Sequence, residues 1–341
     1  MVFAAALQRV RRIGEAATDS RALRAAVLGE IGRVVPFAAH VWALTDPETS
    51  VGTAPLAAVP PQLMPDLPRL IRLKYLTRVN RWTGLTAAAR LTVPADSLVW
   101  RELLHAHGVT DVASVVFRDR YGCWAFLDLW RCGGTFDRDE LAFLDDVAAA
   151  LTGHLRRCEA ASFTTAGAPR DPAPVVLLLD AGLRVLGQTS PTREYLTRLL
   201  PPPADLEPVP AVAYNVAAQL VAVEEGVDDQ PPLARLHLAA GRWLTLRAAR
   251  IGPGERPDAQ IAVTVEDCSP AERTAVFARA CGLAAREAEL LQHLTTGADT
   301  RTVAARMFLS ENTVQDHLKS IFTKTGTRNR RVLLSRATGT A

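Results

Sequence analysis

Three polar side chains near the C-terminus carry groups that match the hydrogen-bonding edges of DNA bases. Gln315 can form two hydrogen bonds with adenine, Asp316 can accept one from the amino group of cytosine, and Lys319 favours the acceptors of guanine. We therefore predict that these three side chains read base edges in the major groove of double-stranded DNA. Because an acid on a DNA-facing surface lowers affinity, Asp316 is either a specificity element or a sign of weak binding.

Other side chains of the same stretch are suited to the phosphate backbone. Phosphate contacts fix the register of a protein on DNA without reading the sequence. The residues predicted to make them lie on the flanks and ends of the stretch: Arg301, Thr313, His317, Lys324 and Arg328.

The helix that must position these side chains has an apolar stripe. Val314, Leu318 and Ile321 recur at helical spacing, and polar residues occupy the opposite face. We expect the apolar face to pack in a core and the polar face to contact DNA. A charged helix face is more often simply solvated, so the stripe alone does not decide the function.

Capping residues divide the stretch into two short helices. Asp299 precedes a predicted helix over 300–307 and Ser310 precedes one over 311–325, where each side chain can accept from backbone N–H groups. The connector between the helices has three residues, which sets them at a steep angle. Gly326 suits the end of the second helix, since it reaches φ > 0 at little cost. This arrangement is a helix-turn-helix.

Positive charge is concentrated in the same part of the chain. Residues 271–341 contain 11 Lys and Arg against 6 Asp and Glu, a net charge of +5, whereas the whole chain carries +3, which leaves −2 for the first 270 residues. From Lys319 to the end there are six basic residues and no acidic one. This distribution favours phosphate binding over a merely solvated face.

A longer motif runs through the helix-turn-helix. It combines a Gly, a capped short helix, Ser-x-x-Thr-Val-x-x-His, an Ile and a Lys-x-Gly, at Gly297, Asp299, Ser310, Thr313, Val314, His317, Ile321, Lys324 and Gly326. It continues upstream through Leu283, Arg286, Glu287 and Leu291, and downstream to a final helix near 330–337. The run resembles the DNA-binding domain of LuxR-type (LuxR/FixJ) transcriptional regulators. The resemblance implies an all-α, four-helix domain that binds DNA.

The sequence departs from that family's pattern at two places. The family usually caps its first helix with Thr, where this chain has Ala284, and the missing cap is worth about 0.5–2 kcal/mol. We therefore expect the start of that helix to fray. The family often has Lys after Thr-Val, where this chain has Gln315 followed by Asp316.

The whole chain has the composition of a multidomain globular protein. It has 341 residues, of which 48% are hydrophobic and 22% are charged, so we expect two or three domains. Its N-terminal apolar patch precedes the arginines, the reverse of a signal peptide, and no apolar run approaches membrane length. We expect a cytoplasmic protein without a membrane segment.

No cofactor, metal site or catalytic residue is predicted. The five cysteines are widely spaced and contain no Cys-x-x-Cys pair, so neither a disulfide framework nor a structural zinc site is indicated. The sequence contains no Gly-x₄-Gly-Lys-Ser/Thr phosphate loop and no Ser/His/Asp or paired-carboxylate motif. We do not expect an enzyme.

Residues 1–160 are predicted to form one α+β domain. The pattern predicts helices over 21–35, 63–76 and 97–107, a strand over 39–44, a hairpin of 111–118 with 121–130, and a helix to about 158 that Asp137 and Glu140 begin with a capping box. This order resembles a GAF domain, a small-molecule sensing fold. Five tryptophans either line a ligand pocket or, more commonly, form core: Trp42, Trp82, Trp100, Trp124 and Trp130.

A proline-rich linker over 164–174 is predicted to precede a second α+β domain over 172–267. Its predicted elements are strands over 175–179 and 184–187, helices over 192–199 and 211–224, and strands over 234–238, 243–249 and 261–266. The order resembles a PAS domain, and the helix over 211–224 is predicted to be amphipathic. Proline-rich loops at 201–210 and 228–232 depart from a compact PAS domain, so a structural or dimer-forming domain is the alternative.

The third domain, over 270–341, begins with a helical connector over 271–281. The predicted fold class is thus α+β multidomain, with GAF-like and PAS-like antiparallel-sheet domains before a four-helix LuxR-type domain. We expect a homodimeric regulator, because one short helix reads only a few base pairs, with Val332, Leu333 and Leu334 at the contact. Control is expected from a small-molecule effector or a protein partner. The alternative is an interaction protein whose sensor domains bind a protein partner rather than a metabolite.

Overall fold

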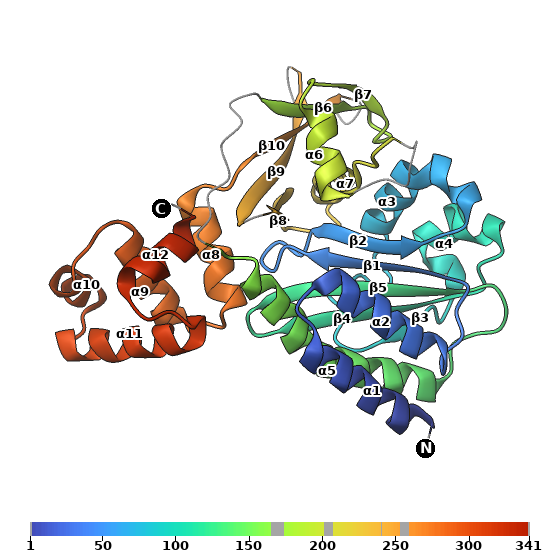
Figure 1. Ribbon diagram of the computed structural model, residues 1–341. Coiled ribbons are helices and arrows are strands. Elements are labelled where there is room, and N and C mark those ends of the chain that lie inside the picture. The colour runs from blue at the N-terminus through green and yellow to red at the C-terminus, as the bar shows by residue number, and fades with distance from the viewer. Residues whose placement is uncertain (1, 165–173, 201–206, 240, 253–258, 340–341) are drawn as a thin grey trace. The chain divides into compact units, whose positions relative to one another are not determined.

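Figure 1 shows the computed structural model of the chain, which describes residues 2–164, 174–200, 207–239, 241–252 and 259–339. The chain divides into two compact units. The first unit comprises Met1–Leu155, Ala173–Leu236 and Thr245–Glu266, and the second comprises Arg156–Pro172, His237–Leu244 and Asp267–Ala341. Most of the predicted linker and residues 201–206 of the predicted loop lie outside the described residues.

The first unit contains most of two modules, each built on a five-stranded sheet; residues 237–244 of the second sheet belong to the second unit. The first module holds β1 (Ala39–Thr45), β2 (Gly52–Ala58), β3 (Ala89–Arg90), β4 (Asp111–Asp119) and β5 (Gly122–Arg131), in the order β2-β1-β5-β4-β3 with antiparallel neighbours. The predicted strand over 39–44 and the predicted hairpin are confirmed, whereas β2 and β3 were not predicted.

Helices cover both faces of this sheet. They are α1 (Val2–Ala16), α2 (Ser20–Gly32), α3 (Leu67–Leu76), α4 (Leu98–Glu102) and α5 (Arg138–Ala161), with short 3₁₀ turns η1 (Pro61–Asp66), η2 (Pro94–Asp96) and η3 (Leu104–His107). In Figure 1, α1, α2 and α5 gather on one side of the sheet and α3 and α4 on the other. The predicted helix over 97–107 is broken, because Leu103 leaves helical geometry at φ −142° and separates α4 from η3.

The start of α5 follows the predicted capping box. The backbone N–H of Glu140 donates to Asp137 Oδ1 at 2.8 Å, and the backbone N–H of Asp137 donates to Glu140 Oε2 at 2.9 Å. Arg131 Nη2 also contacts Glu140 at 2.8 Å, which ties the end of β5 to this helix.

The second module repeats the strand order of the first. Its elements are β6 (Val175–Leu179), β7 (Val185–Gln188), α6 (Thr192–Leu199), α7 (Ala211–Glu224), β8 (Leu233–Ala239), β9 (Arg242–Ile251) and β10 (Gln260–Asp267), and its sheet runs β7-β6-β10-β9-β8. In both sheets the first strand in sequence therefore lies between the second and the last. The predicted elements of this module are confirmed, with strand ends that differ by one or two residues.

Helix α7 differs from the predicted amphipathic helix. Eleven of its 14 residues are buried, including the polar Asn215 and Gln219. The physical reason is that α7 packs on α3 and β2 of the first module, so little of it is left to solvent. A helix that is apolar on most sides is typical of a protein interior.

Buried polar contacts join the two modules within the first unit. Arg235 makes a bidentate pair with Asp46, with Nε–Oδ2 and Nη2–Oδ1 distances of 2.7 and 2.9 Å, and both side chains are nearly inaccessible to solvent. Burial alone would lower the pKa of Arg235, but the bonds from Asp46 and Glu48 outweigh it and raise that pKa. Arg81 also pairs with Asp228, and here Nε and Nη2 both donate to the same oxygen, Oδ2, at 2.9 and 2.5 Å.

Gly52 allows α7 to approach β2 closely. Asn215 Nδ2 donates to the carbonyl oxygen of Gly52 at 3.0 Å. A Cβ atom at position 52 would lie 2.8 Å from that nitrogen, which is closer than side chains approach in proteins. An alanine at this position would therefore displace the Asn215 side chain and disturb its hydrogen bond to β2.

The second unit joins the C-terminal helices to two segments from earlier in the chain. Phe163 stacks on Trp243, with ring centroids 4.4 Å apart, and packs edge-on against Phe277 of α8 (Pro270–Ala280). Ser269 and Glu272 form the capping box at the start of α8, with bonds of 3.2 and 2.9 Å. The predicted helical connector is thus confirmed, and it is packed on one side by aromatic rings. None of the described helices is both long and apolar enough to cross a membrane.

The buried pair between Arg235 and Asp46 yields a test of how strongly the modules are joined. Replacing Asp46 with Ala leaves a buried guanidinium without its main partner, so we expect the free energy of unfolding to fall by about 3–5 kcal/mol in urea titrations. The control is Glu194→Ala, which breaks an exposed pair with Arg198 and should cost about 0.5 kcal/mol or less. Equal losses from both variants would contradict the proposed importance of the buried pair.

Candidate nucleic-acid interface

The C-terminal helices have the predicted helix-turn-helix geometry. They are α9 (Ala285–Thr295), α10 (Thr300–Met307), α11 (Glu311–Thr325) and α12 (Arg330–Thr338). Both predicted caps are confirmed: Asp299 Oδ1 accepts from the N–H of Thr302 at 2.7 Å, and Ser310 Oγ accepts from the N–H of Thr313 at 3.1 Å. Gly326 ends α11 with the expected positive φ, 62°.

The connector between α10 and α11 turns at Phe308. This residue adopts a left-handed conformation, with φ 56°, and its N–H donates back to the last turn of α10. A bulky residue rarely adopts this conformation, and its ring is 94% exposed. The apolar surface of Phe308 therefore lies in solvent directly before the N-terminus of α11.

Burial fixes which face of α11 points outward. Val314 and Ile321 are fully buried and Leu318 is 5% exposed. This stripe packs against α9 and α10, as the apolar pattern predicts. The opposite face is exposed.

The three predicted base-reading residues lie on the exposed surface of α11. Gln315, Asp316 and Lys319 all project into solvent. Lys319 Nζ contacts Asp316 Oδ1 at 2.9 Å, and both side chains are about three-quarters exposed. Such an exposed pair is worth about 1 kcal/mol or less, so either partner can exchange it for a contact to DNA at small cost.

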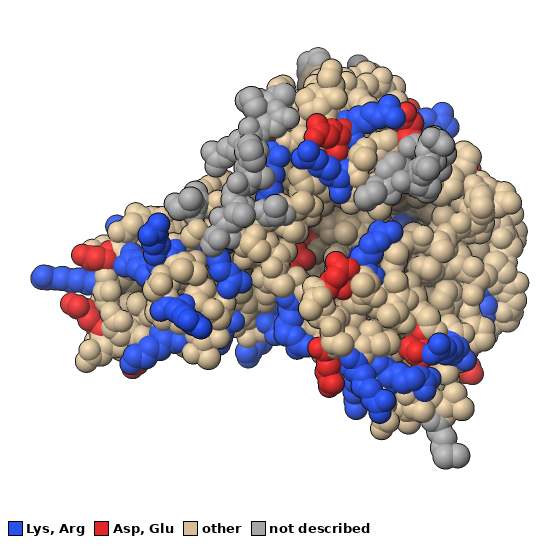
Figure 2. All heavy atoms as spheres, in the orientation of Figure 1, with Lys and Arg blue, Asp and Glu red and all other residues tan. Residues whose placement is uncertain are grey.

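All five predicted phosphate-contacting residues are at least partly accessible. Arg301, Thr313, Lys324 and Arg328 are exposed, and His317 is half-buried. Figure 2 shows basic side chains over much of the visible surface of the C-terminal helices, with a few acidic ones among them. These positions remain predictions as DNA contacts.

Lys324, although exposed, has a partner within the domain. Its Nζ contacts Glu287 Oε2 at 2.6 Å, and the Glu287 side chain is only 6% exposed. Ser320 Oγ donates to the other oxygen of the same carboxylate at 2.6 Å. In this structure Lys324 therefore ties α11 to α9, and the local sequence pattern gives no sign of this partner 37 residues away.

Glu287 also compensates for the missing cap of α9. Its Oε2 accepts from the backbone N–H of Ala284 at 2.6 Å, which satisfies one donor at the helix start. Burial tends to raise the pKa of Glu287, but hydrogen bonds from Lys324, Ser320 and Ala284 outweigh it and hold the pKa below its ordinary value. The predicted fraying of α9 is thus opposed by a contact that was not predicted.

The last helix offers less contact surface than expected. Leu333 is fully buried within the domain, so it cannot contact a partner copy, whereas Val332 is exposed and Leu334 is half-buried. The predicted role of Leu333 in a dimer contact is therefore wrong, because its side chain belongs to the core of its own domain.

Comparison with known proteins identifies the C-terminal domain. Residues 282–337 match the family described as bacterial regulatory proteins, luxR family. These residues therefore form a LuxR-family helix-turn-helix domain, which points to a DNA-binding transcriptional regulator. No curated protein matches the chain.

Some solved structures show a weak likeness. The structure of SdiA in complex with octanoyl-rac-glycerol is 12% identical, covers 99% of this chain and 95% of its own, and has a TM-score of 0.35. That of VqmA bound to DPO is 17% identical over 48% of this chain and 80% of its own, with a TM-score of 0.19. A Vibrio cholerae VqmA dimer is 16% identical over 49% and 83%, also with a TM-score of 0.19. Scores this low support no conclusion about the present chain.

The two lysines of α11 allow a matched test of their roles. Lys324→Met leaves the buried Glu287 carboxylate without its charged partner, so we expect the C-terminal domain to lose about 1.5–3 kcal/mol of stability. Lys319→Met breaks only an exposed pair and should change stability by about 0.5 kcal/mol or less. Urea titration followed by circular dichroism measures both. A larger loss from Lys319→Met would contradict the assignment.

Glu287 also predicts a dependence of stability on pH. Because its pKa is lower in the folded than in the unfolded state, its contribution is fully present above about pH 4.3, the ordinary value, and is lost as the pH falls through the folded-state pKa. We expect Glu287→Gln to be less stable than the unaltered protein at pH 7 and to approach it at pH 3. A stability difference that is the same at both pH values would refute this prediction.

Proposed function

We propose that the protein is a sequence-specific transcriptional regulator that binds double-stranded DNA as a homodimer under the control of its N-terminal modules. In this proposal α11 enters the major groove, where Gln315, Asp316 and Lys319 contact base edges. Arg301, Thr313, His317 and Arg328 contact phosphates. We also propose that the protein is cytoplasmic, because a bacterial regulator must reach the chromosome there.

One observation carries the proposal: the polar face of α11 is exposed while its apolar stripe is buried. A solvated helix needs no particular polar residues, whereas this face presents an amide, a carboxylate and an ammonium group within two turns. These groups together can address adenine, cytosine and guanine. The LuxR-family match over 282–337 supports the same use of the helix.

Lys324 has a different proposed role from the other residues that are predicted to contact phosphate. Since its ammonium group is held by Glu287, a phosphate would have to compete with a short, partly buried ion pair. We propose that Lys324 supports the orientation of α11 and contributes little directly to DNA affinity.

Dimerisation is proposed from the size of the reading surface. One short recognition helix contacts only a few base pairs, and two half-sites about one helical turn apart supply specific affinity. Val332, which α12 exposes, remains a candidate for this contact.

The N-terminal modules are proposed to be GAF-like and PAS-like sensors. Their two sheets share one strand order, and helices cover the first sheet on both faces. Control through them requires an effector whose binding free energy differs between the DNA-binding states.

Fluorescence anisotropy of the full chain on a randomised DNA pool tests the reading surface. We expect Gln315→Ala to lose about 1–3 kcal/mol of discrimination at one or two base positions, with little change in affinity for bulk DNA. Arg328→Ala should instead weaken binding to all sequences alike and reduce the slope of log K against log salt by about one.

Two controls make the outcome decisive. Arg138 begins α5 outside the C-terminal domain, so Arg138→Ala should leave both affinity and salt slope unchanged. If Gln315→Ala and Arg328→Ala cause the same uniform loss, the division between base readers and phosphate contacts is wrong. If no selectivity over bulk DNA is found, the proposed function itself fails.

A further inference from the structure

A cavity of about 610 Å³ lies in the first unit. Cavities that hold small molecules commonly have volumes of about 300–1,000 Å³. Its walls come from β1, β2, β4, β5 and α3 of the first module and from the segment that leads into α7 of the second. Of the five tryptophans considered above, Trp130 lines this cavity, while Trp42, Trp82 and Trp124 are buried in other parts of the core.

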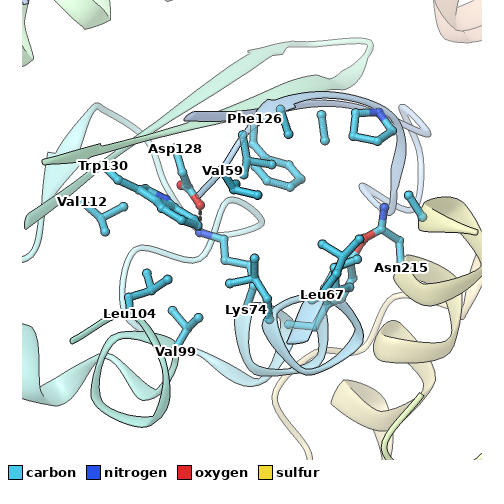
Figure 3. A pocket seen from close by; sticks show the side chains of 18 of the residues that line it. Val59, Leu67, Lys74, Val99, Leu104, Val112, Phe126, Asp128, Trp130 and Asn215 are labelled. Carbon is cyan, nitrogen blue, oxygen red and sulfur yellow. Dashed lines mark ion pairs between the residues drawn. The ribbon is translucent and has the colours of Figure 1, made fainter. Parts of the chain in front are cut away.

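Most of the wall is apolar. Val41, Leu67, Val99, Leu104, Val112 and Phe126 contribute aliphatic or aromatic surface. Figure 3 labels the last five of these side chains around a central space into which Lys74 extends from α3. An apolar wall of this kind favours an occupant with a large apolar part.

One cluster of polar groups interrupts the wall. Lys74 Nζ contacts Asp128 Oδ2 at 2.7 Å, and Ser114 Oγ donates to Asp128 Oδ1 at 2.7 Å. Both carboxylate oxygens of Asp128 therefore already have a donor. Since a carboxylate has no hydrogen to donate, Asp128 does not bind a ligand group that only accepts hydrogen bonds. Figure 3 shows this pair beside Trp130.

Lys74 has unused capacity to donate hydrogen bonds. An ammonium group has three N–H donors, and among the described residues the one oxygen that contacts this group belongs to Asp128. Its other neighbours are the faces of Trp82 and Phe126, with centroids 5.7 and 5.8 Å from Nζ. A ligand oxygen beside Nζ would complete its bonding in an otherwise apolar wall.

The charges of the wall balance. Apart from Tyr75, the ionisable lining residues are Arg21 and Lys74 against Asp128 and Glu207. A ligand carboxylate near Lys74 would lie next to the Asp128 carboxylate and be repelled by it. A ligand ammonium would be repelled by Lys74. The wall therefore matches a neutral acceptor best.

The second module contributes the opposite side of the cavity. Four of its residues line it: Leu200 at the end of α6, Val209 just before α7, and Ala211 and Asn215 of α7. Figure 3 shows Asn215 on α7, across the cavity from Trp130. An occupant that fills the space touches both modules, so its binding adds contacts across the boundary between them.

We propose that this cavity binds a neutral, mainly apolar small molecule whose carbonyl or hydroxyl oxygen accepts a hydrogen bond from Lys74 and whose body contacts both modules. This site deepens the proposed function, because it supplies the effector site on which that control rests. It is nevertheless a binding property of the first unit alone, so it can be tested without DNA.

The test uses the full chain and the neutral fluorophore N-phenyl-1-naphthylamine. We expect saturable binding at one site per chain, with a rise in fluorescence. Displacement is then measured with three ten-carbon compounds that differ in charge: 2-decanone, decanoate and decylamine. The ketone should displace the fluorophore at a concentration at least tenfold lower than either charged compound.

Two variants tie the result to the cavity. Val41→Phe places a ring in the cavity and should weaken fluorophore binding at least tenfold, while Val185→Phe makes the same change at an exposed site on β7 and should leave it unaltered. Lys74→Met combined with Asp128→Asn removes the ion pair without leaving a buried charge unpaired. This double variant should bind 2-decanone about tenfold more weakly yet retain the fluorophore.

Several outcomes would overturn the proposal. They are no saturable uptake, equal binding by the Val41→Phe variant, equal or better displacement by decanoate, and unchanged ketone affinity in the double variant. Because no DNA is present, these outcomes are independent of the anisotropy measurements. A chain that binds the ketone but not DNA would keep the site and lose the proposed function.

Discussion

The orientation of α11 depends on the burial of three side chains. Val314, Leu318 and Ile321 are removed from water, and each such burial stabilises the domain by about 1.5–3 kcal/mol. Turning the helix by one residue would expose part of this stripe. The exposed pair of Asp316 and Lys319 contributes far less, at about 1 kcal/mol or below. Apolar packing, rather than the exposed pair, therefore decides which polar groups face outward, and the Lys324–Glu287 pair supports the same orientation.

In the first unit, buried polar groups determine how α7 packs against the first module. Helix α7 has apolar surface on most sides, and apolar surface alone tolerates many packings. Asn215 has one partner at Gly52, and Arg81 and Arg235 each have a fixed carboxylate. A shifted arrangement would leave these groups buried without partners, which costs several kcal/mol each. The main effect of these bonds is therefore to favour one position of α7 over shifted ones, rather than to add to the free energy of unfolding.

Local signals in the sequence were sufficient for much of the fold. Ser310, Asp299 and Asp137 mark helix starts through chemistry that acts within three residues, and the structure confirms all three. Strand β2 was missed because Pro55 and several alanines weaken its strand pattern. Its place at the edge of the sheet is what tolerates the proline.

Local sequence signals could not predict contacts between residues that are far apart in the chain. The pairing of Lys324 with Glu287 joins residues from two helices, and the motif from which Lys324 was predicted to contact phosphate gives no sign of it. The pair of Lys74 and Asp128 likewise joins α3 to β5. In the sequence, this second pair is indicated only by Asp128 as an acid within an otherwise apolar strand. Spacing within a helix or strand predicts a face, but the partner of that face depends on the packing of the whole unit.

The covalent connection between the modules and the DNA-binding domain limits how control can work. Two residues separate β10 from α8, and the second of them, Ser269, is fixed by its capping box. A connection this short has little slack to absorb a displacement of the sheet. Binding free energy in the cavity can still act on α11 only to the extent that the ligand prefers one state, and by linkage DNA must then change ligand affinity by the same factor. In the proposed site such a preference would arise at the free N–H donors of Lys74 and at the surface of α7, because a bound ligand would contact both.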